Sequence, residues 1–266
     1  MAQEERYFAN SHEHDQEKRR LQLLEEFLDP LARPALLQAG VRLGSHVLEV
    51  GPGAGSMVRW LAETVGPEGH VTAIDINPRF VGDIHLSNVT IRKASILEPP
   101  EGLGPFDVVY SRYVMLHLPD VRAAAETIFD LLKPGGRAVI LDLNWRSLRA
   151  ADRSHPLAAH FDAQMATATD VLLSAGIMDL DFGPKGAVAL DAAGFKDVDS
   201  RGTTRLLRGG TREVQWYRES VAPAEAAVRA YAPERAVDTE MVYAAYDDPT
   251  FFFSSPIETI TIGTRP

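Results

Sequence analysis

Short apolar runs recur through the middle of the chain, and each is followed by a turn or by a segment with helical spacing. Four of these runs are 47–50, 70–75, 107–111 and 137–143. Nearly continuous apolar runs are typical of strands that are buried on both faces of a parallel sheet. An amphipathic segment at 121–133 precedes the last run, and the KPGG at its end predicts a helix stop and a turn. The pattern therefore predicts an α/β chain.

Helical spacing marks the segments on either side of these strands. Residues 5–28 repeat apolar positions at helical spacing, and Pro30 and Pro34 are predicted to break that helix, with Pro34 opening a second, short one. Asn77 and Pro78 predict the N-terminus of another helix directly after the second strand, in a segment short for a full helix. We expect a helical preface or lid at 1–40, followed by one domain at 41–266 with helical insertions at about 146–186 and 210–250.

A glycine-rich turn follows the first predicted strand. Glu49 and Val50 end the strand, the sequence GPGAG occupies 51–55, and a helix is predicted to begin immediately afterwards. Glycine lacks a Cβ, so the backbone can take positive φ and let a ligand approach closely, and a helix N-terminus favours a negative group. The alternative explanation of a lone glycine pattern is a plain tight turn.

Two carboxylates flank this turn in the sequence. Asp75 ends the second predicted strand about 20 residues past the last loop glycine, where a carboxylate can accept hydrogen bonds from a ribose diol. Glu49 precedes the first glycine and would repel a pyrophosphate, whereas it would attract an ammonium group. The pair therefore disfavours NAD and suits S-adenosylmethionine.

With VLEVGPGAGS and Asp75, the chain resembles the class I S-adenosylmethionine-dependent methyltransferases, and LLKPGG before a strand is a further similarity. The resemblance implies a doubly wound, Rossmann-like sheet of seven strands with an antiparallel last strand, plus N-terminal helices and helical lid insertions. It also implies methyl transfer from S-adenosylmethionine to a small organic acceptor, of the natural-product type found in secondary metabolism.

The motifs and the resemblance together indicate the site residues. The cofactor-binding candidates are Tyr7, Glu49, Gly51, Gly53, Gly55, Asp75, Ile76, Ser95, Ile96, Ser111 and Arg112. In this family the corresponding segment is commonly Gly-Asp-Ala, whose aspartate binds the adenine amino group. Ser95 and Ile96 occupy that place here and are expected to contact the adenine instead. The catalytic candidates are Tyr7, His14 and His117.

Four of the polar candidates also have a structural interpretation. Tyr7 would then anchor a surface helix, and His14 would be a solvated residue near a helix start. Arg112 would form a structural ion pair, and His117 would be a core histidine that caps a turn.

The charge balance limits the partners. The chain has a net charge of −10, which argues against a nucleic-acid backbone as partner because phosphates are bound by clustered Lys and Arg. It has no cysteine, and His12 and His14 lack the i, i+4 spacing of metal ligands on a helix, so no metal site is expected. The start of the chain lacks the apolar core of a signal peptide, so a cytoplasmic protein without membrane contact is expected.

Three alternatives to methyl transfer stay open at this point. They are an S-adenosylmethionine-binding cyclase, a non-catalytic binding protein and a nicotinamide oxidoreductase, the last of which Glu49 disfavours. The aromatic sequence PTFFFSSP at 249–256 either closes over the substrate or seals the face of a homodimer. Whether the acceptor atom is oxygen, nitrogen or carbon does not follow from the sequence.

Overall fold

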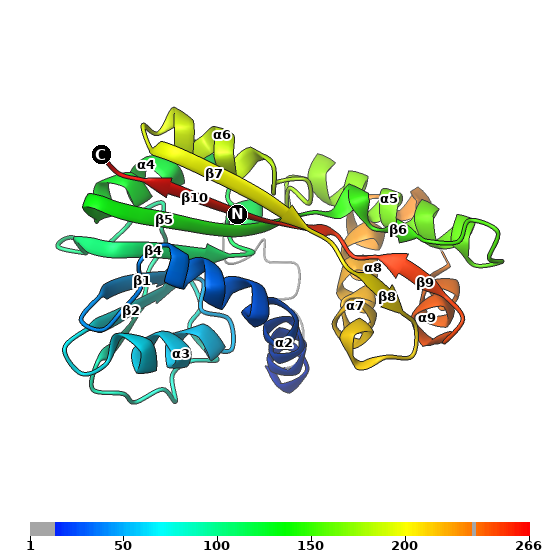
Figure 1. The fold of residues 1–266 in the computed structure, drawn as a ribbon. Helices are drawn as coiled ribbons and strands as arrows, with labels where there is room; N and C mark the ends of the chain where they lie inside the picture. The colour runs from blue at the N-terminus through cyan, green and yellow to red at the C-terminus, as the bar shows by residue number, and fades with distance from the viewer. Residues whose placement is uncertain (1–13, 236–237) are drawn as a thin grey trace. The chain divides into compact units, whose positions relative to one another are not determined.

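The computed structural model describes residues 14–235 and 238–266, and these form two compact units (Figure 1). The sheet unit consists of Leu28–Asp142, Pro184–Arg201 and Thr259–Pro266. The insertion unit consists of the described residues up to Phe27, together with Leu143–Gly183 and Gly202–Glu258.

The sheet unit is built on a seven-stranded sheet of order β3-β2-β1-β4-β5-β10-β7. The strands are β1 (His46–Val50), β2 (His70–Asp75), β3 (Val89–Lys93), β4 (Phe106–Arg112), β5 (Leu132–Asn144), β7 (Lys196–Thr203) and β10 (Ile257–Thr264). The first five in that order are parallel to one another. This doubly wound architecture, predicted from the sequence, is confirmed.

The last strand runs antiparallel to β5. The Gly135 N–H donates to the Arg265 carbonyl over 2.8 Å, and the Arg265 N–H donates to the Gly136 carbonyl over 2.9 Å. The start of β5 therefore meets the end of β10, which is the arrangement of an antiparallel pair.

Helices cover both faces of this sheet. The helices are α2 (His14–Gln38), α3 (Ser56–Val65), α4 (Val121–Leu131) and α6 (Lys185–Ala192), of which α2 enters the sheet unit at Leu28. Figure 1 shows α2 and α3 on one face and α4 and α6 on the other. Helix α3 buries Met57, Val58 and Leu61 completely, because its apolar positions recur at helical spacing.

The predicted break at Pro30 and Pro34 is wrong, because α2 continues through both prolines to Gln38. A proline inside a helix removes one hydrogen bond to the carbonyl four residues earlier. Both prolines lie on the exposed face of α2, where water can satisfy the carbonyls that lose a partner. The opposite face, with Leu28 and Leu36 fully buried, holds the helix together.

The helix predicted at Asn77 and Pro78 is also absent, because 76–88 contains turns at 79–83 and 87–88 and is otherwise irregular. The Val81 N–H donates to the Pro78 carbonyl and the Ile84 N–H donates to the Val81 carbonyl, each across three residues. These bonds close separate turns and do not continue into the i to i+4 pattern of an α-helix.

The KPGG sequence does end α4, but it forms an irregularity of β5 rather than a separate turn. Phe106 pairs with Leu132, whereas Val108 pairs with Arg137, so the intervening residues on β5 bulge out of register. Gly135 in this bulge has φ +78°, a conformation that favours glycine.

The insertion unit combines helices with a small antiparallel sheet of order β6-β9-β8. Its helices are α5 (Ala158–Ser174), α7 (Gln215–Glu219), α8 (Val221–Tyr231) and α9 (Thr239–Asp247), with single helical turns η2 (Trp145–Ser147), η3 (Arg212–Val214) and η4 (Pro233–Arg235). Its strands are β6 (Arg149–Ala150), β8 (Leu206–Arg208) and β9 (Phe252–Ser254).

Aromatic side chains form the core of the insertion unit. The Phe161 ring lies 5.0 Å from that of Phe251 and 5.5 Å from that of Phe253, while Tyr217 and Tyr246 approach Phe253 at 5.6 and 5.5 Å. Such edge-to-face and tilted packing is favourable beyond the area that it buries. Two of the three phenylalanines in PTFFFSSP therefore pack inside their own unit.

We expect Phe253→Ala to lower the free energy of unfolding by about 3–5 kcal/mol, because the side chain is fully buried and its loss leaves a cavity. The matched control is Phe252→Ala on the same strand, whose side chain is 39% exposed, with an expected loss below about 1 kcal/mol. Urea unfolding followed by circular dichroism measures both. Equal losses for the two variants would contradict this packing of Phe253.

Candidate active site

The glycine turn joins β1 to α3 and is conformationally restricted to glycine. Gly51, Gly53 and Gly55 have φ values of +71°, +58° and +92°. A Cβ on Gly51 would lie 2.4 Å from the Val114 side chain, and one on Gly55 would lie 2.6 Å from the Ile84 side chain. Gly55 is the N-cap of α3 and places no side chain in front of the first helical turn. The loop thus needs glycine both for its positive φ values and for its close packing against Val114 and Ile84, and it ends at a helix N-terminus that favours a negative group.

Two acidic side chains share one face of the sheet beside this loop. In the strand register Glu49 is level with Ala73 of β2 and with Tyr110 of β4. Residues in register, and those two positions further along a strand, lie on the same face. Glu49, Asp75, Tyr110 and Arg112 therefore project from one face toward the carboxyl ends of β1, β2 and β4.

The two carboxylates differ in burial. Glu49 is 1% exposed, whereas Asp75 is partly exposed at the end of β2. The Asn77 N–H donates to Asp75 Oδ1 over 2.7 Å, which holds the carboxylate at the strand end. The buried group suits a cationic ligand atom, and the more accessible one suits hydroxyl groups.

Ser111 lies on the opposite face, level with Val50, and is 1% exposed. Its hydroxyl makes no hydrogen bond within the described part of the chain. A buried hydroxyl without a partner is costly, so a ligand that supplied one would be favoured there.

A carboxylate that the sequence interpretation missed ties the loop to its surroundings. Asp29 of α2 accepts hydrogen bonds from Arg112 over 2.6 Å, Arg33 over 2.9 Å and the Ser56 hydroxyl over 3.0 Å. Ser56 is the first residue of α3, and Arg112 ends β4. One buried side chain therefore connects α2, the start of α3 and the end of β4. The signal in the sequence was an acid on the apolar face of α2, directly after Leu28.

Burial and charge set the ionisation of the residues in this cluster. Burial by itself lowers the pKa of Arg112, but Tyr110 and Asp29 outweigh it, and the pKa is raised. Burial raises the pKa of the Tyr110 hydroxyl above its ordinary value of 10.0, although the positive charge of Arg112 opposes this shift. Arg112 is thus a fixed cation in an ion pair, the structural interpretation that the sequence had left open.

The remaining cofactor candidates lie beside the ends of β2 and β3. Ile76 directly follows β2 and is partly buried. Ser95 is partly buried two residues after β3, and its hydroxyl accepts a hydrogen bond from the Leu97 N–H over 3.2 Å. Ile96 is 2% exposed. Because β2 and β3 are parallel neighbours, these residues lie at the same edge of the sheet as Asp75.

The three catalytic candidates are described one by one, because they do not share one described unit. Tyr7 lies outside the described residues. His14 is the exposed first residue of α2, in the insertion unit. His117 is partly buried at the end of the helical turn η1 (Met115–His117), five residues after β4 in the sheet unit.

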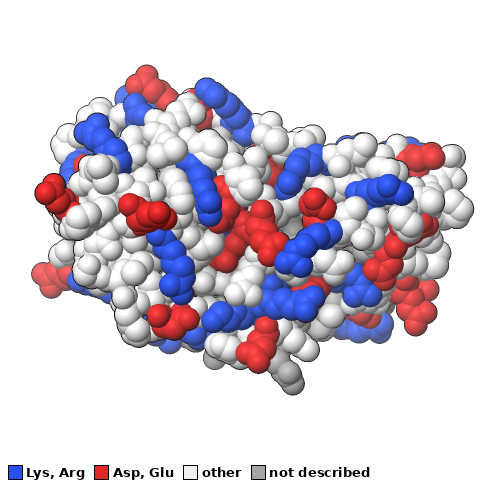
Figure 2. All heavy atoms as spheres, turned by 60° about the horizontal axis from the view of Figure 1, so that its bottom comes forward, with Lys and Arg blue, Asp and Glu red and all other residues white. Residues whose placement is uncertain are grey.

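Charged side chains of both signs are interspersed on the face drawn in Figure 2. The described residues on this face form no continuous basic surface of the kind that binds nucleic acid. Within residues 14–235 and 238–266, no helix is long and apolar enough to cross a membrane, and no cluster of three potential metal-binding side chains occurs.

Residues 12–198 match the family profile described as a methyltransferase domain. The chain belongs to the class I S-adenosylmethionine-dependent methyltransferases. This confirms the family predicted from the sequence, together with S-adenosylmethionine as the co-substrate that the family uses.

Two curated relatives show how far the similarity extends. Nocamycin O-methyltransferase of Saccharothrix syringae is 34% identical over 187 residues, which are 65% of this chain and 67% of that protein. Methyltransferase str2 of Strobilurus tenacellus is 37% identical over 100 residues, so the matched region spans 37% of this chain and 36% of that protein.

Solved structures share the fold at low sequence identity. An N-methyltransferase from Haemonchus contortus, solved with S-adenosylhomocysteine, has a TM-score of 0.58 at 16% identity, covering 100% of this chain and 61% of that chain. The [4+2]-cyclase SpnF has a TM-score of 0.52 at 17% identity, covering 90% of this chain and 80% of that chain. Likeness at these identities shows the fold and not the reaction.

The residues at the carboxyl ends of the strands fit S-adenosylmethionine. The positive-φ glycines open the backbone beside the helix N-terminus, and Glu49 provides a buried anion. Ser111 provides a buried hydroxyl that no described residue engages. The site thus offers an anion for an ammonium group and an acceptor for hydroxyls beside a helix N-terminus.

Replacing Asp29 tests whether this carboxylate holds the loop. We expect Asp29→Asn to lower the free energy of unfolding by about 3–5 kcal/mol, because it removes the carboxylate that forms an ion pair with the buried Arg112. Asp83→Asn is the control, since Asp83 is 64% exposed and approaches Arg59 at 3.7 Å. Urea denaturation measures both variants, and a loss no larger than the control's would show that Arg112 does not depend on Asp29.

A second prediction concerns alkaline pH. The pKa of Tyr110 is raised in the folded chain, so the folded state keeps its proton after the unfolded state loses it above the ordinary value of 10.0. The contribution of the protonated Tyr110 to the free energy of unfolding is therefore complete below that value. Above it, this contribution is lost by about 1.4 kcal/mol per pH unit. The free energy of unfolding of Tyr110→Phe, measured by urea titration, should fall less steeply than that of the wild type from about pH 9 to 11. Tyr231→Phe, at a side chain that is 50% exposed, should match the wild type, and identical slopes for all three proteins would refute the assignment.

Proposed function

We propose that this protein transfers the methyl group of S-adenosylmethionine to a small organic acceptor in natural-product metabolism. The observation that carries the proposal is the pairing of Glu49 and Asp75 on one face of the sheet, on either side of a loop with three positive-φ glycines. The name of nocamycin O-methyltransferase supports the natural-product context.

We assign the following roles to the residues of the sheet unit. Glu49 attracts the ammonium group of the methionine part, and the backbone of the 51–55 loop contacts that part closely. Asp75 accepts hydrogen bonds from the ribose hydroxyls. Ser95 and Ile96 contact the adenine. The Ser111 hydroxyl donates a hydrogen bond to the cofactor from the opposite face of the sheet.

When bound, the cofactor supplies an electrophilic methyl group on a sulfonium. The main contribution of the chain is then to hold donor and acceptor in line and to exclude water, because good orientation alone removes a large part of the barrier. A general base is needed only where the acceptor loses a proton. His117 is the candidate within the sheet unit, and Tyr7 and His14 are the candidates near the start of the chain.

The acceptor atom is proposed to be oxygen. The nocamycin enzyme is named as an O-methyltransferase, and its match to this chain extends over 67% of its length. Product mass and formation of S-adenosylhomocysteine test the reaction. A product without added methylene mass, formed from a bound substrate in the presence of S-adenosylmethionine, would instead favour a cyclase.

Asp75→Asn is the test of the cofactor site. The amide keeps an oxygen for the Asn77 N–H but loses the charge, so affinity for S-adenosylmethionine should fall by about 1–3 kcal/mol while the melting temperature stays unchanged. Isothermal titration with S-adenosylmethionine and S-adenosylhomocysteine measures the affinity.

Asp83→Asn, in the same connection between β2 and β3, serves as the matched control and should bind like the wild type. Unchanged affinity in Asp75→Asn would remove Asp75 from the site. Absence of binding by the wild-type protein would overturn the proposed function as a whole.

A further inference from the structure

The insertion unit contains a pocket that the cofactor site does not use. It has a volume of about 270 Å³, and Trp145, at the point where β5 ends, is the first of its lining residues along the chain. That volume is close to the lower limit of about 300 Å³ for small-molecule pockets. A compact organic molecule fits such a space.

The pocket has apolar walls and an aromatic side chain that is held in place. Leu148 and Met165 line it and are 3% and 8% exposed. The Trp145 ring lies 6.0 Å from both the Trp216 and the Tyr217 rings, which pack against it. A rigid aromatic wall contributes large contact area at a small entropic cost.

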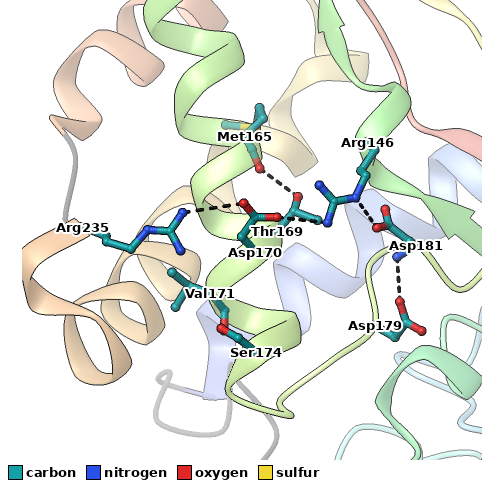
Figure 3. A network of polar contacts seen from close by, with 9 residues as sticks. All are labelled: Arg146, Met165, Thr169, Asp170, Val171, Ser174, Asp179, Asp181 and Arg235. Carbon is teal, nitrogen blue, oxygen red and sulfur yellow. Dashed lines mark hydrogen bonds and ion pairs between the residues drawn. The ribbon is translucent and has the colours of Figure 1, made fainter.

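Three arginines line the same pocket, but one of them is already neutralised. Figure 3 shows the Arg146 guanidinium between Asp170 and Asp181, and it forms ion pairs with both. Asp170 also approaches Arg235 at 3.6 Å. This network of two arginines and two aspartates has no net charge, so Arg146 has no excess charge to offer a ligand.

The other two arginines do have excess charge. Arg149 and Arg153 are exposed and form no ion pair with any residue in the described ranges. One carboxylate, Asp162, lines the pocket beside them, and its Oδ1 accepts the Ala150 N–H over 2.7 Å. Two cations against one anion leave a local positive charge, although the chain as a whole has a net charge of −10.

We propose that this pocket binds a small molecule with a flat apolar body and a carboxylate, the body against Trp145 and the carboxylate at Arg149 and Arg153. Arginine matches a carboxylate through two parallel hydrogen bonds, and the apolar walls supply the remaining affinity. This inference rests on the proposed function in one respect, namely that the bound acid is the methyl acceptor. It assigns an acidic acceptor class to the enzyme.

The test compares 2-naphthoate with 2-naphthamide, which have the same flat body and differ in charge. Both are titrated into the full-length protein and into the Arg149→Gln/Arg153→Gln double variant, with binding measured by calorimetry. We expect the wild type to bind the acid at least about tenfold more tightly than the amide, and the double variant to lose that difference. Raising the salt concentration should weaken binding of the acid alone.

Arg229→Gln is the matched control, because Arg229 is an exposed arginine of the same unit that pairs with Glu225 on α8. It should bind 2-naphthoate like the wild type. Equal affinity of the wild type for acid and amide, or undiminished binding of the acid by the double variant, would overturn the proposal.

The titrations separate this proposal from the proposed function. S-adenosylmethionine is titrated into the same proteins, and the double variant should bind it like the wild type. Arginine-dependent binding of the acid by a protein that does not bind S-adenosylmethionine would refute the assignment of the acid as methyl acceptor. Binding of S-adenosylmethionine without arginine-dependent binding of the acid would refute the pocket assignment and leave methyl transfer standing.

Discussion

The ion pair between Asp29 and Arg112 is the interaction on which the candidate site depends. A buried carboxylate is costly unless donors compensate for its lost hydration, and Asp29 has three of them, from α2 itself, from β4 and from the first residue of α3. The glycine loop cannot fix its own geometry, because glycine allows the backbone a wide range of conformations. The loop is therefore held from outside, by a network that fixes the helix following it.

Parallel strands explain why the remaining site residues meet. Glu49, Asp75, Ser95 and Ser111 lie far apart in the sequence, yet each stands at or just beyond the carboxyl end of a strand. Neighbouring parallel strands end at the same edge of the sheet, where ligands of open α/β folds bind. The alternation of side chains then decides which face each residue uses, and it separates Ser111 from the two carboxylates.

The sequence predicted the strands and the glycine loop because their signals are local: an apolar run, an acid and a set of glycines within a few residues. It failed where a local signal was overridden by tertiary packing. Pro30 and Pro34 have the usual sequence signature of a helix end, but the buried face of α2 outweighs two lost hydrogen bonds on the exposed face. Asp29 and Arg112 are 83 residues apart, so no spacing rule could pair them. The aromatic sequence near the C-terminus was recognised as unusual, but its place at the centre of a three-stranded sheet depends on partners from two other segments.

The two units differ in the charged groups that they offer to a ligand. In the sheet unit the site carboxylates are suited to a cationic cofactor, and a net charge of −10 adds a long-range attraction for it. The same field repels an acidic acceptor, so such a molecule requires a local positive group that overcomes it at short range. In the proposal Arg149 and Arg153 supply that group, while Arg146 beside them is neutralised by Asp170 and Asp181. The pairing of one arginine and the exposure of the other two are therefore the features on which the proposed anion site rests.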